Sequence, residues 1–269
     1  YSVTRPGAME GVKYFLVPNV KNFSWMTVVA AMGQMFYSLS IAMGILITFG
    51  SYMKKETSLE DSTRNVEVFD TAIAIMAGLM IIPAVFSFSG GDPDTLQAGP
   101  ALMFITIPKV FENMGFGTVV GILFFLLVLF AAVTSSIALT ESAVSTFEDE
   151  LGWSRRRATV LVGVIMIALG SLSSLGYGPL VGIKIIGMQF LDFFDFLTNS
   201  VMMPIAAMLT SLFVSRIVGM KRMEEEIMHG ESTFRRKKIF IVMIKYLCPV
   251  FALIILISSV ANAFGWIAM

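Results

Sequence analysis

The stretch from Asn22 to Met53 contains no Asp, Glu, Lys or Arg. A transmembrane helix needs about 20 predominantly apolar residues, so this stretch is long enough to cross a bilayer. Its middle nevertheless contains Ser38, Ser40 and Gly44, which a helix facing only lipid does not need. One interpretation is that the helix opens at mid-membrane and leaves backbone carbonyls free inside a protein-lined cavity. The alternative is a helix that packs through small residues, with each serine hydroxyl bonded to its own preceding turn.

The rest of the chain has the composition of a polytopic membrane protein. Hydrophobic residues make up 56% of the 269 residues and charged residues 14%, and several more long uncharged runs follow the first. A soluble chain of this length would alternate polar and apolar faces, so we predict an all-α membrane fold with six transmembrane helices. The expected spans cover residues 24–52, 68–88, 118–147, 158–175, 190–217 and 239–264.

The segments between these spans differ in character. Residues 1–23 are predicted to form a loop with one short surface helix, and residues 54–67 a charged loop. The sequence SGGDP at 89–93 predicts a sharp break in the chain. Residues 96–114 are too polar to span a membrane and too apolar for a free loop, so we expect a re-entrant or capping hairpin that bends at Pro108.

Basic residues are distributed unequally between two sets of loops. By the positive-inside rule, the richer set is cytoplasmic, which places both ends of the chain on the outside. The richer set, which includes a short loop of three consecutive arginines, contains Lys54, Lys55, Arg64, Arg155, Arg156, Arg157, Arg216, Lys221, Arg222, Arg235, Arg236, Lys237 and Lys238. The poorer set contains Arg5, Lys13, Lys21, Lys109 and Lys184.

Several classes of function are disfavoured. The formal net charge is +0, and no basic patch interleaved with aromatic residues indicates nucleic-acid binding. The single cysteine, Cys248, excludes an intramolecular disulfide and a cysteine metal cluster. The single histidine, His229, lies in a charged loop and is expected to be solvated. Without a nucleophile–base pair or a metal cluster on facing spans, an intramembrane enzyme is not expected.

The third expected span contains a group of oxygen-bearing residues. Ala131, Thr134 and Ser135 are spaced i, i+3 and i+4, so they share one helix face. One carbonyl and two hydroxyls can converge there on a sodium ion, a hard cation that takes oxygen ligands. The alternative is that both hydroxyls bond back to their own helix. The same face continues to Glu141, whose carboxylate costs about 2.5–3.5 kcal/mol at mid-membrane and therefore needs a partner or a wet cavity.

Two segments resemble helices of one transporter family. The sequence GQMFYSLS at 33–40, followed by Gly44, resembles the unwound sixth helix of the neurotransmitter:sodium symporter family. The sequence FAAVTSSIA at 130–138, closing with EDEL at 148–151, resembles the eighth helix of that family. The resemblance covers the whole chain and implies the broken-helix, inverted-repeat fold of these symporters. It implies one membrane domain over residues 1–269, running from the end of the fifth helix through the eleventh, with five amino-terminal helices missing.

The resemblance also implies roles for particular side chains. The residues implied to line the substrate pocket, with the first as its aromatic lid, are Tyr37, Ser38, Ser40, Met43, Ser135 and Leu139. Those implied to bind sodium are Ser38, Asp70, Ala131, Thr134 and Ser135. Those implied to gate the pathway on its two sides are Tyr37, Tyr52, Glu141, Asp149 and Asp195.

Asp70 and Gln34 are implied to form a charge site. Asp70 begins the second expected span and resembles a bacterial pattern in which a carboxylate serves sodium and replaces bound chloride. Gln34 matches the chloride-site amide of chloride-dependent members. The alternative for Asp70 is a helix cap in the first turn. Asp192 and Asp195, on one face at the start of the fifth span, have the same alternative.

These observations predict part of a secondary active transporter in the cell (inner) membrane of a bacterium. It would couple sodium influx to uptake of a neutral, hydrophobic or aromatic amino acid, with sodium ions required and chloride not required. Its expected partners are the amino acid, the lipid bilayer and the missing amino-terminal helices of the same transporter. The alternative is a channel or scaffold subunit without sodium-coupled transport.

Overall fold

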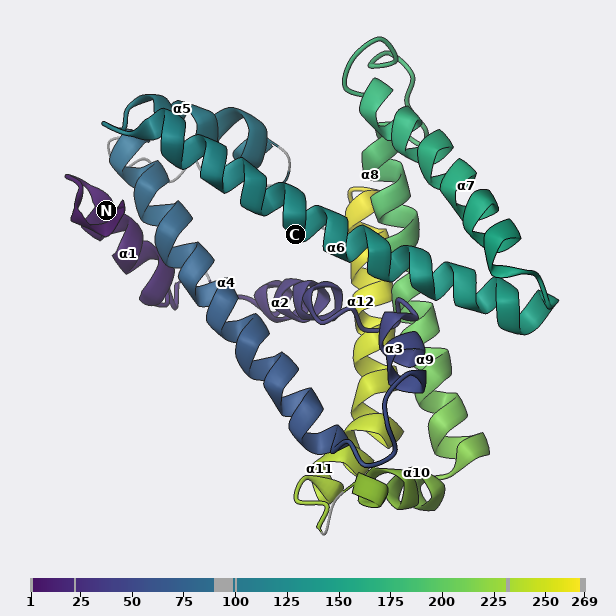
Figure 1. The fold of residues 1–269 in the computed structure, drawn as a ribbon. Helices are drawn as coiled ribbons and strands as arrows, with labels where there is room; N and C mark the ends of the chain where they lie inside the picture. The colour runs from purple at the N-terminus through teal and green to yellow at the C-terminus, as the bar shows by residue number, and fades with distance from the viewer. Residues whose placement is uncertain (1, 22, 90–98, 100, 231–232, 267–269) are drawn as a thin grey trace. The chain divides into compact units, whose positions relative to one another are not determined.

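The computed structural model describes the chain except residues 1, 22, 90–98, 100, 231–232 and 267–269. Apart from one isolated β-bridge, its regular structure over those residues is helical, which confirms the predicted all-α class. The chain forms two compact units. The first combines residues 1–23 with 65–135, and the second combines 24–64 with 136–269. Figure 1 shows the course of the helices.

Five helices within the described residues are long and apolar enough to cross a membrane. They confirm an integral multi-pass membrane protein, and the large hydrophobic side chains exposed along them suit contact with lipid. Their bounds are Leu59–Phe88, Gly117–Leu151, Arg155–Leu175, Phe190–Val218 and Lys237–Ala263. The first predicted span does not count among them because it is divided into two shorter helices.

The division separates α2 (Trp25–Ser38) from α3 (Ile45–Ser51). The start of α2 is defined by a capping box, in which Ser24 and Thr27 each accept a hydrogen bond from the other's backbone N–H. Residues 39–44 between the two helices are not helical. Positive φ angles recur there, at 54° for Ser40, 63° for Ala42 and 80° for Gly44. Left-handed conformations are costly for residues with a Cβ, so only Gly44 adopts its angle without strain.

The first unit contains η1 (Ser2–Thr4) and α1 (Ala8–Leu16), which is the short helix expected near the start. Helix α1 packs on α4 (Leu59–Ser89), as Figure 1 shows. The contact depends on Gly11, where an added Cβ would lie 2.8 Å from the Cα of Pro83. A core of Val85 with Ile107 and Val110 joins α4 to α5 (Ile107–Glu112).

Two predicted helix starts were wrong in the same way. Helix α4 begins at Leu59, inside the predicted charged loop, and α7 (Arg155–Leu175) begins within the predicted arginine loop. Hydropathy ends a span at the first charges, but Glu and Arg are good helix formers and continue the helix into water. The serine hydroxyl of Ser58 also accepts from the backbone N–H of Asp61 at 3.0 Å and caps the new start of α4.

Three prolines follow π-helical turns. Pro108 follows η3 (Leu102–Thr106), Pro204 follows η4 (Phe196–Met202) and Pro249 follows η7 (Met243–Leu247). Proline has no N–H to donate and clashes with the carbonyl of residue i−4, and a widened turn relieves both problems. The backbone is right-handed helical on entering α5, so the chain continues as a helix past Pro108, and the bend predicted there stays a prediction. The first residues of the predicted hairpin, and most of the break at 89–93, lie outside the described residues.

The second unit contains the remaining helices. Val144 of α6 (Gly117–Leu151) packs with Ala158 and Val162 of α7 in a buried core. The last two spans run side by side through α9 and α12 (Figure 1). Their segments and the links between them are α8 (Phe190–Asp195), α9 (Met203–Phe213), η5 (Val214–Val218), α10 (Met220–Ile227), η6 (Met228–Gly230), α11 (Lys237–Val242) and α12 (Cys248–Ala263).

Candidate functional site

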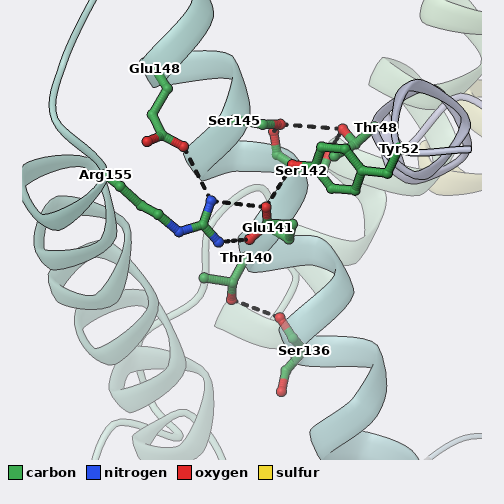
Figure 2. A network of polar contacts seen from close by, with 9 residues as sticks. All are labelled: Thr48, Tyr52, Ser136, Thr140, Glu141, Ser142, Ser145, Glu148 and Arg155. Carbon is green, nitrogen blue, oxygen red and sulfur yellow. Dashed lines mark hydrogen bonds and ion pairs between the residues drawn. The ribbon is translucent and has the colours of Figure 1, made fainter.

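The described structure brings polar side chains of α3 and α6 together inside the second unit (Figure 2). Thr48 of α3 donates from its hydroxyl to that of Ser142 at 3.4 Å, and the Ser145 hydroxyl also lies 3.4 Å away. Thr48 is 8% exposed and Ser142 6% exposed. Gly44 lies against the same place, because a Cβ there would be 2.6 Å from the Ser142 hydroxyl oxygen.

A second polar group adjoins the first and is centred on the Glu141 carboxylate (Figure 2). Tyr52 donates its hydroxyl to Glu141 Oε1 at 2.7 Å. The Arg155 guanidinium pairs with both Glu141 oxygens, at 3.1 Å and 2.5 Å, and reaches Glu148 at 3.3 Å. A two-bond pairing of this kind fixes the geometry as well as neutralising the charge.

The Glu141 contacts answer the sequence-based expectation that this carboxylate needs a partner. Tyr52 and Glu141 were both expected among the gate residues, and the two are hydrogen-bonded. In the sequence, Arg155 was considered only as one of the basic residues that orient the chain. It begins the helix that follows the acidic end of the preceding span, and this position could have indicated a partner for Glu141. Thr48 and Ser142 were not predicted to meet, because nothing local links residues so far apart in the sequence.

The residues expected to bind sodium on α6 lie in the first unit. Thr134 donates its hydroxyl to the carbonyl oxygens of Ala131 at 2.9 Å and Phe130 at 3.1 Å. This is the intrahelical bonding foreseen as the alternative. The two interpretations are compatible, because a hydroxyl that donates its proton keeps oxygen lone pairs for a cation. The sodium role of Thr134 and Ser135 therefore stays a prediction.

The residues expected to line the substrate pocket are placed without a test of their role. Tyr37 and Ser38 are the last residues of α2, and Ser40 and Met43 lie in the non-helical segment that follows. Leu139 lies on the part of α6 that belongs to the same unit. The pocket residues expected on the first predicted span therefore lie at the end of α2 and in the non-helical segment that follows it.

The acidic residues outside the polar groups have different surroundings. Asp70 lies well inside α4 and is partly buried, so it cannot cap the first turn and that alternative was wrong. Asp195 accepts a hydrogen bond from the Asn199 amide at 2.5 Å, and Asp149 is exposed near the end of α6.

Asp192 accepts a hydrogen bond from the Tyr177 hydroxyl at 3.4 Å. Partial desolvation, helped by the Asp192 charge, raises the pKa of Tyr177 although the residue is 52% exposed.

A double-mutant cycle tests the Glu141–Arg155 pair. We expect Arg155→Gln to lower the thermal midpoint in detergent more than Glu141→Gln does, because Glu141 is only 20% exposed and loses its cation, whereas Arg155 is 59% exposed and keeps Glu148 and water. The double variant should lose less than the two single losses added together. Arg156→Gln, at the neighbouring exposed arginine, is the control and should change little. Additive losses would show that the pair carries no coupling.

The fold and these polar groups define an integral membrane protein with an interrupted helix, tied to a long neighbouring helix through buried hydroxyls. The profile of the sodium:neurotransmitter symporter family matches residues 1–265. The chain belongs to that family, whose members are transporters and not enzymes.

Similar proteins agree with this assignment. An uncharacterized sodium-dependent transporter of Bacillus subtilis is 34% identical over 86% of this chain and 50% of its own length. One from Haemophilus influenzae is 33% identical over 96% and 55%. The crystal structure of MhsT in complex with L-phenylalanine is 35% identical with a TM-score of 0.83, covering 96% of this chain and 58% of that one. The chain thus spans about half the length of these relatives.

Proposed function

We propose that this chain forms part of a secondary active transporter in the cell membrane that couples sodium entry to amino-acid uptake. The observation that carries the proposal is the interruption between α2 and α3, in a chain that belongs to a symporter family. Non-helical backbone in a spanning segment exposes carbonyl oxygens and amides that can coordinate a cation and hold a carboxylate. Carbonyl oxygens for the cation and amides for the carboxylate are both needed to bind sodium and an amino acid together.

The proposed substrate is a neutral amino acid with a hydrophobic or aromatic side chain. Met43 and Leu139, which we assign to the pocket, make an apolar and deformable wall that would disfavour a charged side chain. Tyr37 is assigned as the aromatic lid over that pocket. One similar protein, MhsT, was crystallised in complex with L-phenylalanine, which makes this amino acid the first probe to use.

Sodium is assigned to oxygen ligands from the side chains of Ser38 and Asp70. It is also assigned to the Ala131 carbonyl and the hydroxyls of Thr134 and Ser135. These ligands suit a hard monovalent cation better than a soft one, because they are all oxygen. We further assign Asp70 the fixed negative charge that makes chloride unnecessary, and Gln34 the matching amide of the charge site. Tyr52, Glu141, Asp149 and Asp195 are assigned to the gates.

Uptake into proteoliposomes tests this function. The complete transporter to which this chain contributes should accumulate labelled L-phenylalanine against its gradient when sodium is higher outside. Replacing sodium by potassium, or collapsing the sodium gradient with an ionophore, should remove the accumulation. Equal uptake in both cations would contradict sodium coupling. Downhill flux that never exceeds equilibrium would favour the channel alternative.

A further inference from the structure

Helix α3 is a short helix between two non-helical links. It has seven residues and is flanked by non-helical residues on both sides, 39–44 before it and 52–58 after it. The preceding segment holds three positive φ angles, including those of Ser40 and Ala42. Non-helical links lack the hydrogen-bond ladder that holds a continuous helix straight, so small dihedral changes there can reorient a short helix without unfolding it.

The contact between α3 and α6 has the chemistry of a reversible one. At its centre are the hydroxyls of Thr48, Ser142 and Ser145 rather than large apolar side chains. One of these hydroxyls also has a bond within its own helix, because Ser145 donates to the Ser142 carbonyl at 3.1 Å. Separation therefore leaves the Ser145 hydroxyl with a partner, which lowers the usual large cost of breaking a polar contact.

Gly44 makes the approach possible. Its φ of 80° favours glycine, and a Cβ would lie 2.6 Å from the Ser142 hydroxyl oxygen. The same residue thus permits both the turn that begins α3 and the close contact that docks it. We call Gly44, Thr48, Ser142 and Ser145 the hydroxyl latch.

We propose that the hydroxyl latch holds α3 against α6 in the conformation described here and must separate during each transport cycle. Its members act as positioning residues and are distinct from the Tyr52–Glu141–Arg155 group. The proposal rests on the proposed function, since a cycle of alternating access requires such contacts to form and break. A permanent packing contact would instead stay closed whatever ions are present.

Reversible cross-linking tests the latch in the complete transporter. In a Cys248→Ser background, Thr48→Cys with Ser142→Cys replaces hydroxyls 3.4 Å apart by thiols that can form a disulfide. Oxidation should lower phenylalanine uptake at least about tenfold, and reduction should restore it. The control pair is Val144→Cys with Ala158→Cys, which joins α6 to α7 within their shared buried core and should leave uptake unchanged once cross-linked. Full uptake by the cross-linked latch would overturn the proposal.

A second measurement does not depend on uptake. With Thr48→Cys alone in the same background, the rate of modification by a water-soluble thiol reagent is followed by mass spectrometry in sodium and in potassium. Thr48 is 8% exposed, so its modification reports opening. We expect the two rates to differ several-fold. Equal rates would contradict the latch even in a protein that transports, whereas different rates without sodium-driven uptake would contradict the proposed function alone.

Discussion

Replacing Thr134 and Ser135 together by alanine is expected to raise the sodium concentration needed for half-maximal uptake by about tenfold to a hundredfold. The estimate follows from the loss of a buried polar contact, which typically costs about 1–3 kcal/mol. The Thr134 hydroxyl donates to Ala131 and Phe130 within its own helix, which orients its lone pairs away from those carbonyls. Both side chains are exposed within this chain, so their replacement by alanine removes no packing contact described here.

The control for this prediction is Thr140→Ala. Thr140 also donates to a carbonyl one turn back on α6, at 2.7 Å to Ser136, but its hydroxyl contacts α7 through Met166. It therefore loses the same kind of intrahelical bond without touching the proposed sodium ligands. Sodium titrations of uptake distinguish the two variants. If the double variant keeps the wild-type sodium dependence, the hydroxyls only stabilise their own helix and the sodium site lies elsewhere.

Replacing Asp70 by serine is expected to abolish uptake in chloride-free medium and to make uptake respond to added chloride. Sodium ions inside a membrane carry positive charge in a poorly screening medium, so a negative charge must lie close by. Either a fixed carboxylate or a mobile chloride can supply it. Asp70 is partly buried in the interior of α4, and it is the only acidic residue in the predicted second span. Gln34 is assigned as one of the chloride contacts in the variant.

Glu67→Gln is the matched control, since it removes a carboxylate from an exposed position on the same helix. It should leave uptake independent of chloride. The measurement is phenylalanine uptake with chloride or gluconate as the anion. Wild-type uptake that collapses in gluconate would refute the role of Asp70, as would an Asp70→Ser protein that transports normally without chloride.

The pattern of apolar residues was enough to predict the fold class and most of the span positions. The third predicted span, 118–147, lies inside α6, and the last, 239–264, matches α11 to α12 within a few residues. Hydropathy over about 20 residues is a local property, and it decides whether a segment can cross a membrane. The prediction of a span therefore does not depend on tertiary contacts. Helix starts were less predictable, as at Leu59 and Arg155, because charged residues end an apolar run without ending a helix.

The contacts between polar groups on different helices could not be predicted from the sequence pattern. The spacing of serines marked residues 33–44 as unusual, but it could not show that Gly44 and Thr48 dock on Ser142. Nor could it show that the three-arginine segment supplies the partner of Glu141 through Arg155. Such pairs depend on where distant helices pack, and packing is set by close approach and by the need of every buried polar group for a partner. The local pattern of residues specifies neither which helices approach closely nor which partner a buried polar group finds.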